Sequence, residues 1–144
     1  MTKGGAPQAP AEFRPPTGRF GRQDRLQSQT EFRAVMRRGR RARGPHFVMI
    51  ALRSTHPRSR IGLAVAKAAG HAPQRARLRR LLRESFRALR GLCTFPSDVV
   101  VIAQIPWPGA GLAAVQAELA RLGAQVHVWS AAMVGPADRP GGRA

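Results

Sequence analysis

A chain of 144 residues has the length of about one domain, which excludes a large multidomain enzyme. Its 25 basic and 7 acidic side chains give a formal net charge of +18 at pH 7, which indicates a polyanionic partner. Only Lys3 and Lys67 are lysines. Because the arginine guanidinium pairs with phosphate through a planar fork and stacks on bases, nucleic acid is favoured over a membrane surface.

Several protein classes are excluded by what the sequence lacks. It has no apolar run near the roughly 20 residues of a membrane span, and residues 1–16 contain no signal-peptide hydrophobic segment, so we expect a cytoplasmic protein with no membrane partner. Cys93 is the single cysteine, so the chain forms no internal disulfide and no cysteine-based zinc finger. We expect Cys93 to be a small buried hydrophobic residue.

Charge and composition divide the chain. Residues 1–90 carry 22 basic and 4 acidic side chains, whereas residues 91–144 carry 3 of each, so one face built from the first part should meet the anion. We predict a disordered basic arm over residues 1–22, an RNA-binding domain over residues 23–123 and a partly disordered extension over residues 124–144. The apolar residues 126–129 are consistent with a short strand or with a packed extension.

The first elements follow from the apolar pattern. Thr30 is expected to cap a helix over residues 31–38, which Gly39 ends. Its inward side chains are Phe32, Val35 and Met36. Residues 47–53 form an apolar run of strand length. Residues 60–67 alternate large and small side chains, which predicts a strand with one bulky face and one face of small residues.

The segment from Pro73 to Arg90 has the strongest helical pattern of the sequence. A buried strand over residues 98–105 and an amphipathic helix ended by Gly123 follow it. The order α-β-β-α-β-α predicts an α+β protein, a single-domain α/β sandwich with a small mixed sheet and packed helices. In the helix predicted from Pro73 to Arg90, the inward side chains are Leu78, Leu81, Leu82, Phe86, Ala88 and Leu89.

An arc of arginines lies beside that inward stripe, and it includes Arg75, Arg79, Arg80, Arg83, Arg87 and Arg90. A solvated helix face usually mixes charges of both signs, but this helix holds seven arginines and only Glu84, so like charges repel at i and i+4. The arc therefore indicates phosphate binding. DNA is disfavoured because no helix-turn-helix or basic zipper pattern accompanies the arginines.

A second basic cluster consists of Arg37, Arg38, Arg40, Arg41 and Arg43. If it lies near the arginine helix, the two form one surface for an RNA backbone; otherwise it is a flexible loop. Phe32 and Phe47 are candidates for a groove between the first helix and the sheet. The four histidines lack metal-site spacing, and the chain has no catalytic carboxylate pair or nucleophile motif, so we predict no metal site and no catalytic residue in the protein.

The order of elements and one long motif are similar to those of the bacterial ribonuclease P protein subunit. The resemblance covers approximately residues 25–123 and is strongest from Arg60 to Glu84. There Arg60-Ile61-Gly62-Leu63-Ala64-Val65-Ala66-Lys67 leads through Gly70-His71-Ala72 to Arg75-Ala76-Arg77-Leu78-Arg79-Arg80. The last of these runs, from Arg75 to Arg80, resembles the Arg-Asn-Arg signature helix of the family.

The resemblance implies a protein that binds the catalytic RNA of ribonuclease P and assists removal of the 5′ leader from precursor tRNA. It implies that the RNA performs the hydrolysis with Mg²⁺, which is held mainly by the RNA, and that a left-handed crossover joins the parallel strands. Contacts with the RNA subunit are expected from Lys67, Arg75, Arg77, Arg79, Arg80, Arg83 and Arg87, and a leader groove from Phe32, Met36, Phe47 and Ile50. A structural ribosomal protein or RNA chaperone that uses the same basic face is the alternative.

The sequence departs from the family pattern in two regions. Ala76 replaces the signature asparagine, and Ala68 stands where a second lysine often follows Lys67, so some RNA contacts of the family are lost. Met36 and Ile50 occupy groove positions where aromatic residues are frequent. Base stacking in the leader groove is therefore expected to be weaker here, with apolar packing in its place.

Overall fold

The computed structural model describes residues 21–108 and 111–129. Its elements are the 3₁₀ turn η1 (Arg22–Asp24), helix α2 (Gln29–Arg38), strands β1 (Arg40–Arg43), β2 (Phe47–Arg53) and β3 (Arg60–Val65), the turn η2 (Lys67–Ala69), helix α3 (Ala72–Leu89), the turn η3 (Arg90–Leu92), strand β4 (Ser97–Ala103) and helix α4 (Leu112–Gln125). The predicted α+β class and all six predicted elements are confirmed, and β1 is an additional strand. Residues 1–20 and 130–144, where the arm and most of the extension were expected, lie outside the described residues.

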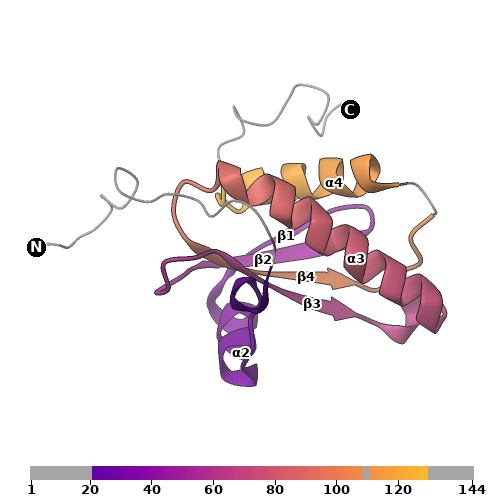
Figure 1. The fold of residues 1–144 in the computed structure, drawn as a ribbon, viewed down its shortest axis with the longest axis horizontal. Coiled ribbons are helices and arrows are strands. Elements are labelled where there is room, and N and C mark those ends of the chain that lie inside the picture. Colours follow the sequence, from indigo (N-terminus) through magenta and orange to yellow (C-terminus); the bar gives the residue numbers. More distant parts are fainter. Residues whose placement is uncertain (1–20, 109–110, 130–144) are drawn as a thin grey trace, which may run out of the picture.

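The four strands form one mixed sheet in the order β1-β2-β4-β3. Strand β2 pairs antiparallel with both β1 and β4, and β3 pairs parallel with β4. Helix α3 connects the adjacent parallel strands β3 and β4, as a βαβ unit requires; the handedness of this crossover stays an expectation. Helices α3 and α4 cover one face of the sheet and α2 lies on the other face (Figure 1).

The sheet separates two apolar clusters. The larger cluster lies under α3 and α4 and includes Met49, Leu82, Val101 and Leu119, while the smaller lies under α2 and includes Val35. Strands buried on both faces read as continuous apolar runs, which is why β2 and β4 are recognisable in the sequence. None of the helices in the described part of the chain combines the length and apolarity of a membrane span.

Strand β3 has the two unlike faces that its sequence predicts. Ile61 is buried in the larger cluster with α3 and α4. On the other face a Cβ at Gly62 would lie 2.9 Å from Cε2 of Phe32, so the ring occupies the space that a side chain would need. The strand ends at Val65 and β4 ends at Ala103, two residues before each predicted boundary.

Two predicted helix ends are wrong. Ser28, and not Thr30, caps α2, because its Oγ accepts a hydrogen bond from the Glu31 N–H at 3.0 Å and so satisfies a donor of the first turn. Helix α4 continues past Gly123 to Gln125. Gly123 is needed for close packing instead, since a Cβ there would lie 2.1 Å from the Trp129 ring.

Residues after α4 complete the core. Val126, Val128 and Trp129 are buried in the larger cluster, and Trp129 Nε1 donates to the Ala120 carbonyl at 2.9 Å. This segment is a packed extension and not a strand. The core therefore reaches Trp129, beyond the domain boundary expected at residue 123.

Two ion clusters connect distant segments. Asp24 is 1% exposed and contacts Arg58 and Arg90, each at 2.9 Å. Arg60 donates two hydrogen bonds to Asp98, which faces it across the β3–β4 pairing, and a third to Glu31 of α2. The Asp24 pairs attach the chain before α2 to the β2–β3 connection and to η3, and the Glu31–Arg60 pair attaches α2 to the sheet.

Cys93 is buried, as predicted. Burial raises the pKa of the Cys93 thiol to about 11, although the Ser59 hydroxyl, 3.4 Å from the sulfur, acts in the opposite direction. The thiolate is the reactive form of cysteine, so this side chain is a structural residue.

Candidate nucleic-acid interface

Helix α3 turns its apolar stripe toward the sheet. Leu78, Leu82, Phe86 and Leu89 are buried in the larger cluster. Pro73 stands in the first turn, and the Gln74 side chain accepts a hydrogen bond from the His71 N–H at 2.7 Å. The start and the inward face of α3 are thus those expected from the sequence, except at Ala88 and Arg90.

Two residues near the end of α3 lie opposite to their predicted sides. Ala88 is exposed, although helical periodicity placed it on the inward stripe. Arg90 is 1% exposed and belongs to the ion cluster of Asp24, although periodicity placed it in the arginine arc. The helix ends at Leu89, so the 100° spacing no longer applies at residue 90.

The remaining basic side chains form the α3 arginine face, defined as Arg75, Arg77, Arg79, Arg80, Arg83 and Arg87. Arg75 Nε donates to the Gly70 carbonyl at 3.2 Å, and Arg87 pairs with Glu84 at 3.0 Å. Lys67 is exposed in η2, just before the helix. In residues 21–108 and 111–129, no carboxylate pairs with Arg77, Arg79, Arg80 or Arg83.

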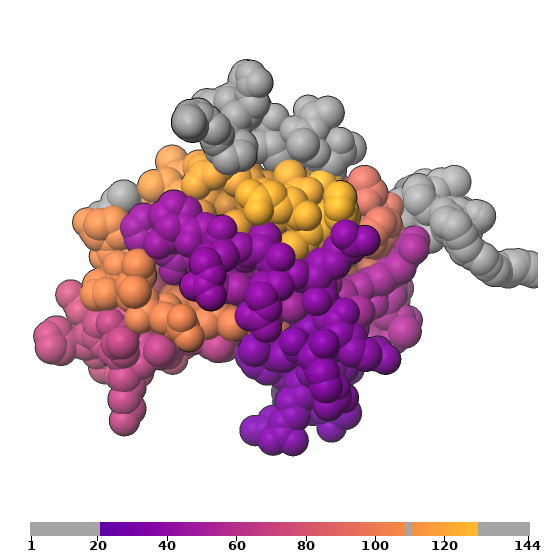
Figure 2. All heavy atoms as spheres, turned by 180° about the vertical axis from the view of Figure 1, so that it is seen from behind, coloured from indigo at the N-terminus to yellow at the C-terminus, as the bar shows by residue number. Residues whose placement is uncertain are grey.

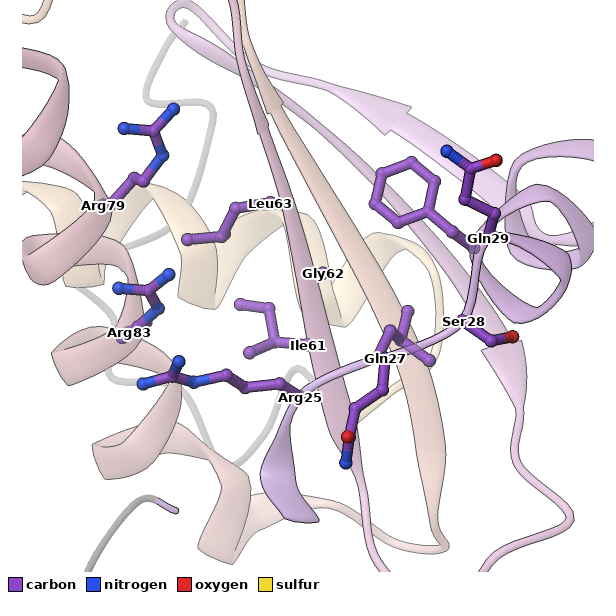
Figure 3. A pocket seen from close by; sticks show the side chains of 11 residues that line it. Arg25, Gln27, Ser28, Gln29, Ile61, Gly62, Leu63, Arg79 and Arg83 are labelled. Carbon is purple, nitrogen blue, oxygen red and sulfur yellow. The ribbon is translucent and has the colours of Figure 1, made fainter. Parts of the chain in front are cut away.

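A pocket of about 420 Å³ lies beside β3, between α3 and the chain that leads into α2. In Figure 3, Arg79 and Arg83 enter it from α3, and Arg25 extends toward them from the segment that also carries Gln27, Ser28 and Gln29. Phe32, Leu26, Ile61, Gly62 and Leu63 complete the lining. The pocket therefore joins a cluster of guanidinium groups to a partly apolar wall.

The arginines of this pocket influence one another. Burial lowers the pKa of Arg83, and the positive charges of Arg25 and Arg79 lower it further. Crowded cations of this kind are stabilised by an anion placed between them. The pocket is therefore suited to hold a phosphate group.

Arg25 is a candidate site residue that the sequence did not single out as one. It is placed by β-type pairing, since the Leu26 N–H donates to the Ile61 carbonyl at 3.0 Å and Arg25 forms a parallel bridge with Ile61. No local pattern predicts this pairing, because it joins residues that are distant in the sequence. The one indication in the sequence that Arg25 matters is that the family resemblance begins at Arg25 and Leu26.

The predicted leader groove holds only in part. Phe32 lines the pocket, and Met36 is half-buried on the same side of the sheet. Ile50 is 0% exposed beneath α2 and offers no surface to a ligand. Phe47 is on the opposite face of the sheet, buried and stacked on Trp107 with ring centroids 5.3 Å apart. Alternation along β2 puts residues 47 and 50 on opposite faces, so the prediction for Phe47 was wrong.

The second basic cluster is neither a flexible loop nor an extension of the α3 arginine face. Arg37 and Arg38 form the last turn of α2, and Arg40, Arg41 and Arg43 belong to β1. Strand β1 is at one edge of the sheet, and β3, beside the pocket and α3, is at the other. The two basic surfaces are therefore separate.

The acidic side chains in the described part of the chain are all in contact with basic groups. The contacts are Asp24 with Arg58 and Arg90, Glu31 with Arg60 and His56, Glu84 with Arg87, Asp98 with Arg60, and Glu118 with His46. No three His, Cys, Asp or Glu side chains of this part gather as a group that could hold a metal ion. The two basic surfaces are thus left largely without acidic partners.

The chain is similar in sequence to proteins of one known family. The profile of the Ribonuclease P family matches residues 20–127. The ribonuclease P protein component of an Exiguobacterium species is 37% identical over 105 residues, which is 73% of this chain and 91% of that protein. This extent of sequence similarity confirms the resemblance drawn from the motif.

Solved structures show the same fold. The RNase P protein from Staphylococcus aureus superposes with a TM-score of 0.65 at 23% identity, over 74% of this chain and 98% of that one. The RNase P protein from Thermotoga maritima gives 0.57 at 26% identity, over 66% and 90%. With the sequence match and the mixed sheet in agreement, the chain belongs to the ribonuclease P protein family.

Proposed function

We propose that this chain is the protein subunit of ribonuclease P. It binds the catalytic RNA through the α3 arginine face and the 5′ leader of precursor tRNA in the pocket beside Phe32. The RNA hydrolyses the phosphodiester bond, and the protein lowers the repulsion between the two RNAs. The observation that carries this proposal is the pocket in which Arg79 and Arg83 of α3 meet Phe32 of α2.

The α3 arginine face supports the contact with the catalytic RNA. Four of its guanidinium groups lack a carboxylate partner within the described ranges, so their charge is available to phosphates. Backbone contacts carry no base information, which suits recognition of a folded RNA by its shape. Association through such contacts weakens steeply with salt.

The pocket supports binding of the leader. Its volume of about 420 Å³ lies in the range of small-molecule sites and accommodates a nucleotide. Arg25, Arg79 and Arg83 would hold a phosphate, while Phe32 and Leu26 offer apolar surface to a base. Single-stranded RNA is the form in which bases are free for such contacts.

Mg²⁺ is assigned to the RNA in this proposal. The carboxylates of Asp24, Asp98 and Glu118 are buried and in contact with basic groups, and Glu31 and Glu84 are in ion pairs. Mg²⁺ prefers oxygen ligands, which the phosphates of the RNA supply. The arginines of this chain would reduce the number of Mg²⁺ ions needed to hold the two RNAs together.

The experiment measures two affinities with separate variants. Arg77→Gln with Arg80→Gln removes charge from the exposed α3 arginine face without changing the residues that line the pocket. We expect about tenfold weaker binding to a bacterial ribonuclease P RNA, from roughly 0.7 kcal/mol for each of the two lost phosphate contacts. A control with the same loss of charge, Arg53→Gln with Arg121→Gln, should bind as the wild type does.

The pocket is tested by precursor and mature tRNA on the assembled complex. Phe32→Ala should weaken binding of precursor tRNA while leaving mature tRNA unchanged, because only the precursor carries a leader. Equal affinities of the wild-type complex for the two tRNAs would contradict the leader assignment. That result, together with tight RNA binding, would favour a structural ribosomal protein or an RNA chaperone.

A further inference from the structure

A second basic surface lies at the β1 edge of the sheet, and the proposed function does not use it. We call it the β1 arginine surface and define it as Arg37, Arg38, Arg40, Arg41 and Arg43. All five side chains are exposed. Figure 2 shows the α2 and β1 region, indigo to purple, facing the viewer below α4, on the side opposite to the view of Figure 1.

These arginines are carried by rigid backbone. Strand β1 pairs with β2 from Arg40 opposite Ala51 to Arg43 opposite Val48, and Ala42 between them is buried. A Cβ at Gly39 would lie 2.7 Å from the Val35 carbonyl oxygen and 2.8 Å from that of Ala51, so this glycine permits the close turn from α2 into β1.

The pairing fixes the spacing of the charges. Arg41 and Arg43 are two residues apart on one strand, so they point to the same face with their Cα atoms about 7 Å apart. Arg40 points to the other face of the sheet. Arg37 and Arg38 extend the surface from the last turn of α2. Arg41 and Arg43 lie on the α2 side of the sheet, where Arg37 and Arg38 continue the group, and these four positive charges suit the regular phosphates of a nucleic-acid backbone.

Structural roles account for only part of this charge. Basic residues at a helix C-terminus interact favourably with the helix dipole, which is equivalent to about half a unit charge. A charge on an edge strand also hinders pairing with other chains. Neither role needs five cations, and every carboxylate of the described part is paired elsewhere. The remaining positive charge of this surface indicates that it binds an external polyanion.

The position of the surface separates it from the α3 arginine face. Strands β1 and β3 are at opposite edges of the sheet, three strand spacings or about 14 Å apart before side chains are counted. A stiff duplex that lies on one edge does not bend around the domain to reach the other.

We therefore propose that the β1 arginine surface binds the backbone of double-stranded RNA, and that the protein holds two separate RNA segments at once. Binding at this site is independent of base sequence, because the guanidinium groups contact phosphates and not base edges. It adds to the proposed function a second contact that binds one RNA segment while α3 holds another.

The experiment uses the full chain and a plain RNA duplex of about 16 base pairs, the length that duplex-binding domains cover. Added to the Arg77→Gln with Arg80→Gln variant, in which the α3 arginine face is weakened, Arg41→Gln with Arg43→Gln should weaken duplex binding about tenfold. The slope of log K against log salt should become less steep by about 1.8, as expected for two lost phosphate contacts to a duplex. The control Arg53→Gln with Arg121→Gln should change neither quantity. Because Arg41 and Arg43 are exposed, thermal unfolding of the Arg41→Gln with Arg43→Gln variant should match that of the wild type.

Bridging is tested with two duplexes that carry different fluorophores. The wild type should bring them together and produce energy transfer at equimolar protein. The β1 double variant and the Arg77→Gln with Arg80→Gln variant should each reduce the transfer several-fold while still binding one duplex. Unchanged duplex affinity when Arg41→Gln and Arg43→Gln are added to the Arg77→Gln with Arg80→Gln variant, or wild-type transfer in either double variant, would overturn the proposal.

The assay separates this inference from the proposed function because it contains no ribonuclease P RNA. A protein that bridges duplexes but gives precursor and mature tRNA equal affinity would retain the second site and lose the leader assignment. A protein that discriminates the two tRNAs, but in which the β1 substitutions do not weaken duplex binding, would retain the leader assignment and lose the second site.

Discussion

Phe32 of α2 packs against Gly62 of β3 so closely that a Cβ at position 62 would lie 2.9 Å from Cε2 of the ring. Both residues line the pocket that also contains Arg79 and Arg83. The glycine thus sets how deeply the aromatic ring is seated, and with it the shape of the proposed leader site.

Gly62→Ala should therefore displace the Phe32 ring. We expect a loss of about 1–3 kcal/mol in the free energy of unfolding, the usual effect of overpacking. The complex with catalytic RNA should also lose part of its preference for precursor over mature tRNA. Gly91→Ala is the matched control, because a Cβ at Gly91 meets no atom within 4 Å. Equal effects of the two substitutions in urea unfolding and in tRNA binding would refute the packing argument.

Asp24→Asn removes a buried carboxylate from between two arginines. Arg90, itself 1% exposed, would lose the charge that compensates it, so we expect about 3–5 kcal/mol of destabilisation. Arg58→Gln should cost far less, because the Arg58 side chain is 40% exposed and remains hydrated without its partner. Urea unfolding of both variants at neutral pH measures the contrast.

The same carboxylate makes stability depend on pH. Burial raises the pKa of Asp24, but hydrogen bonds from the Gly21 N–H, Arg90 and Arg58 outweigh it, so the pKa lies below its ordinary value. Arg60 outweighs burial at Glu31 in the same way and lowers the pKa of that side chain.

Such groups bind protons more tightly in the unfolded state, so their stabilisation is complete above about pH 5, roughly one unit above the unfolded-state pKa, and is lost as the pH falls through the folded-state pKa. We expect the urea midpoint to drop between pH 5 and pH 3 at constant ionic strength. The drop should be smaller in Asp24→Asn, whose side chain does not titrate. An identical pH dependence in wild type and variant would show that Asp24 does not contribute.

His127 follows α4 with φ of 63°, in the left-handed region that favours glycine. The tight turn there is held by the Val128 N–H, which donates to the Gly123 carbonyl at 2.9 Å. His127→Gly should stabilise the fold by about 1 kcal/mol by relieving this conformation. His127→Ala keeps the strain and should give no gain in melting temperature. A gain in both variants would assign the effect to the side chain.

Apolar periodicity predicted most of the fold. Strands β2 and β4 are continuous apolar runs, and α3 carries leucines at helical spacing, so the local sequence predicts which side chains of these elements are buried. Strand β1 was missed because an edge strand of three arginines and one buried alanine has no apolar alternation. Its strand form comes from pairing with β2, which is a tertiary effect.

The candidate site was predictable only where it follows a helix face. The outward arginines of α3 were placed correctly up to Arg87, but charge alone does not distinguish Arg90, which pairs with a buried carboxylate. Arg25 enters the pocket through a pairing with Ile61 that no local pattern reveals. Phe47 was assigned to the wrong face of the sheet, although the alternation between Phe47 and Ile50 already places the two on opposite sides.

The most direct test is cleavage of a precursor tRNA by a bacterial ribonuclease P RNA at low Mg²⁺, with and without this protein. We expect the wild type to stimulate cleavage, and we expect no stimulation from Arg79→Ala with Arg83→Ala, which changes both the α3 arginine face and the pocket. Tight RNA binding by a folded wild-type protein without any stimulation would contradict the assignment as a ribonuclease P subunit.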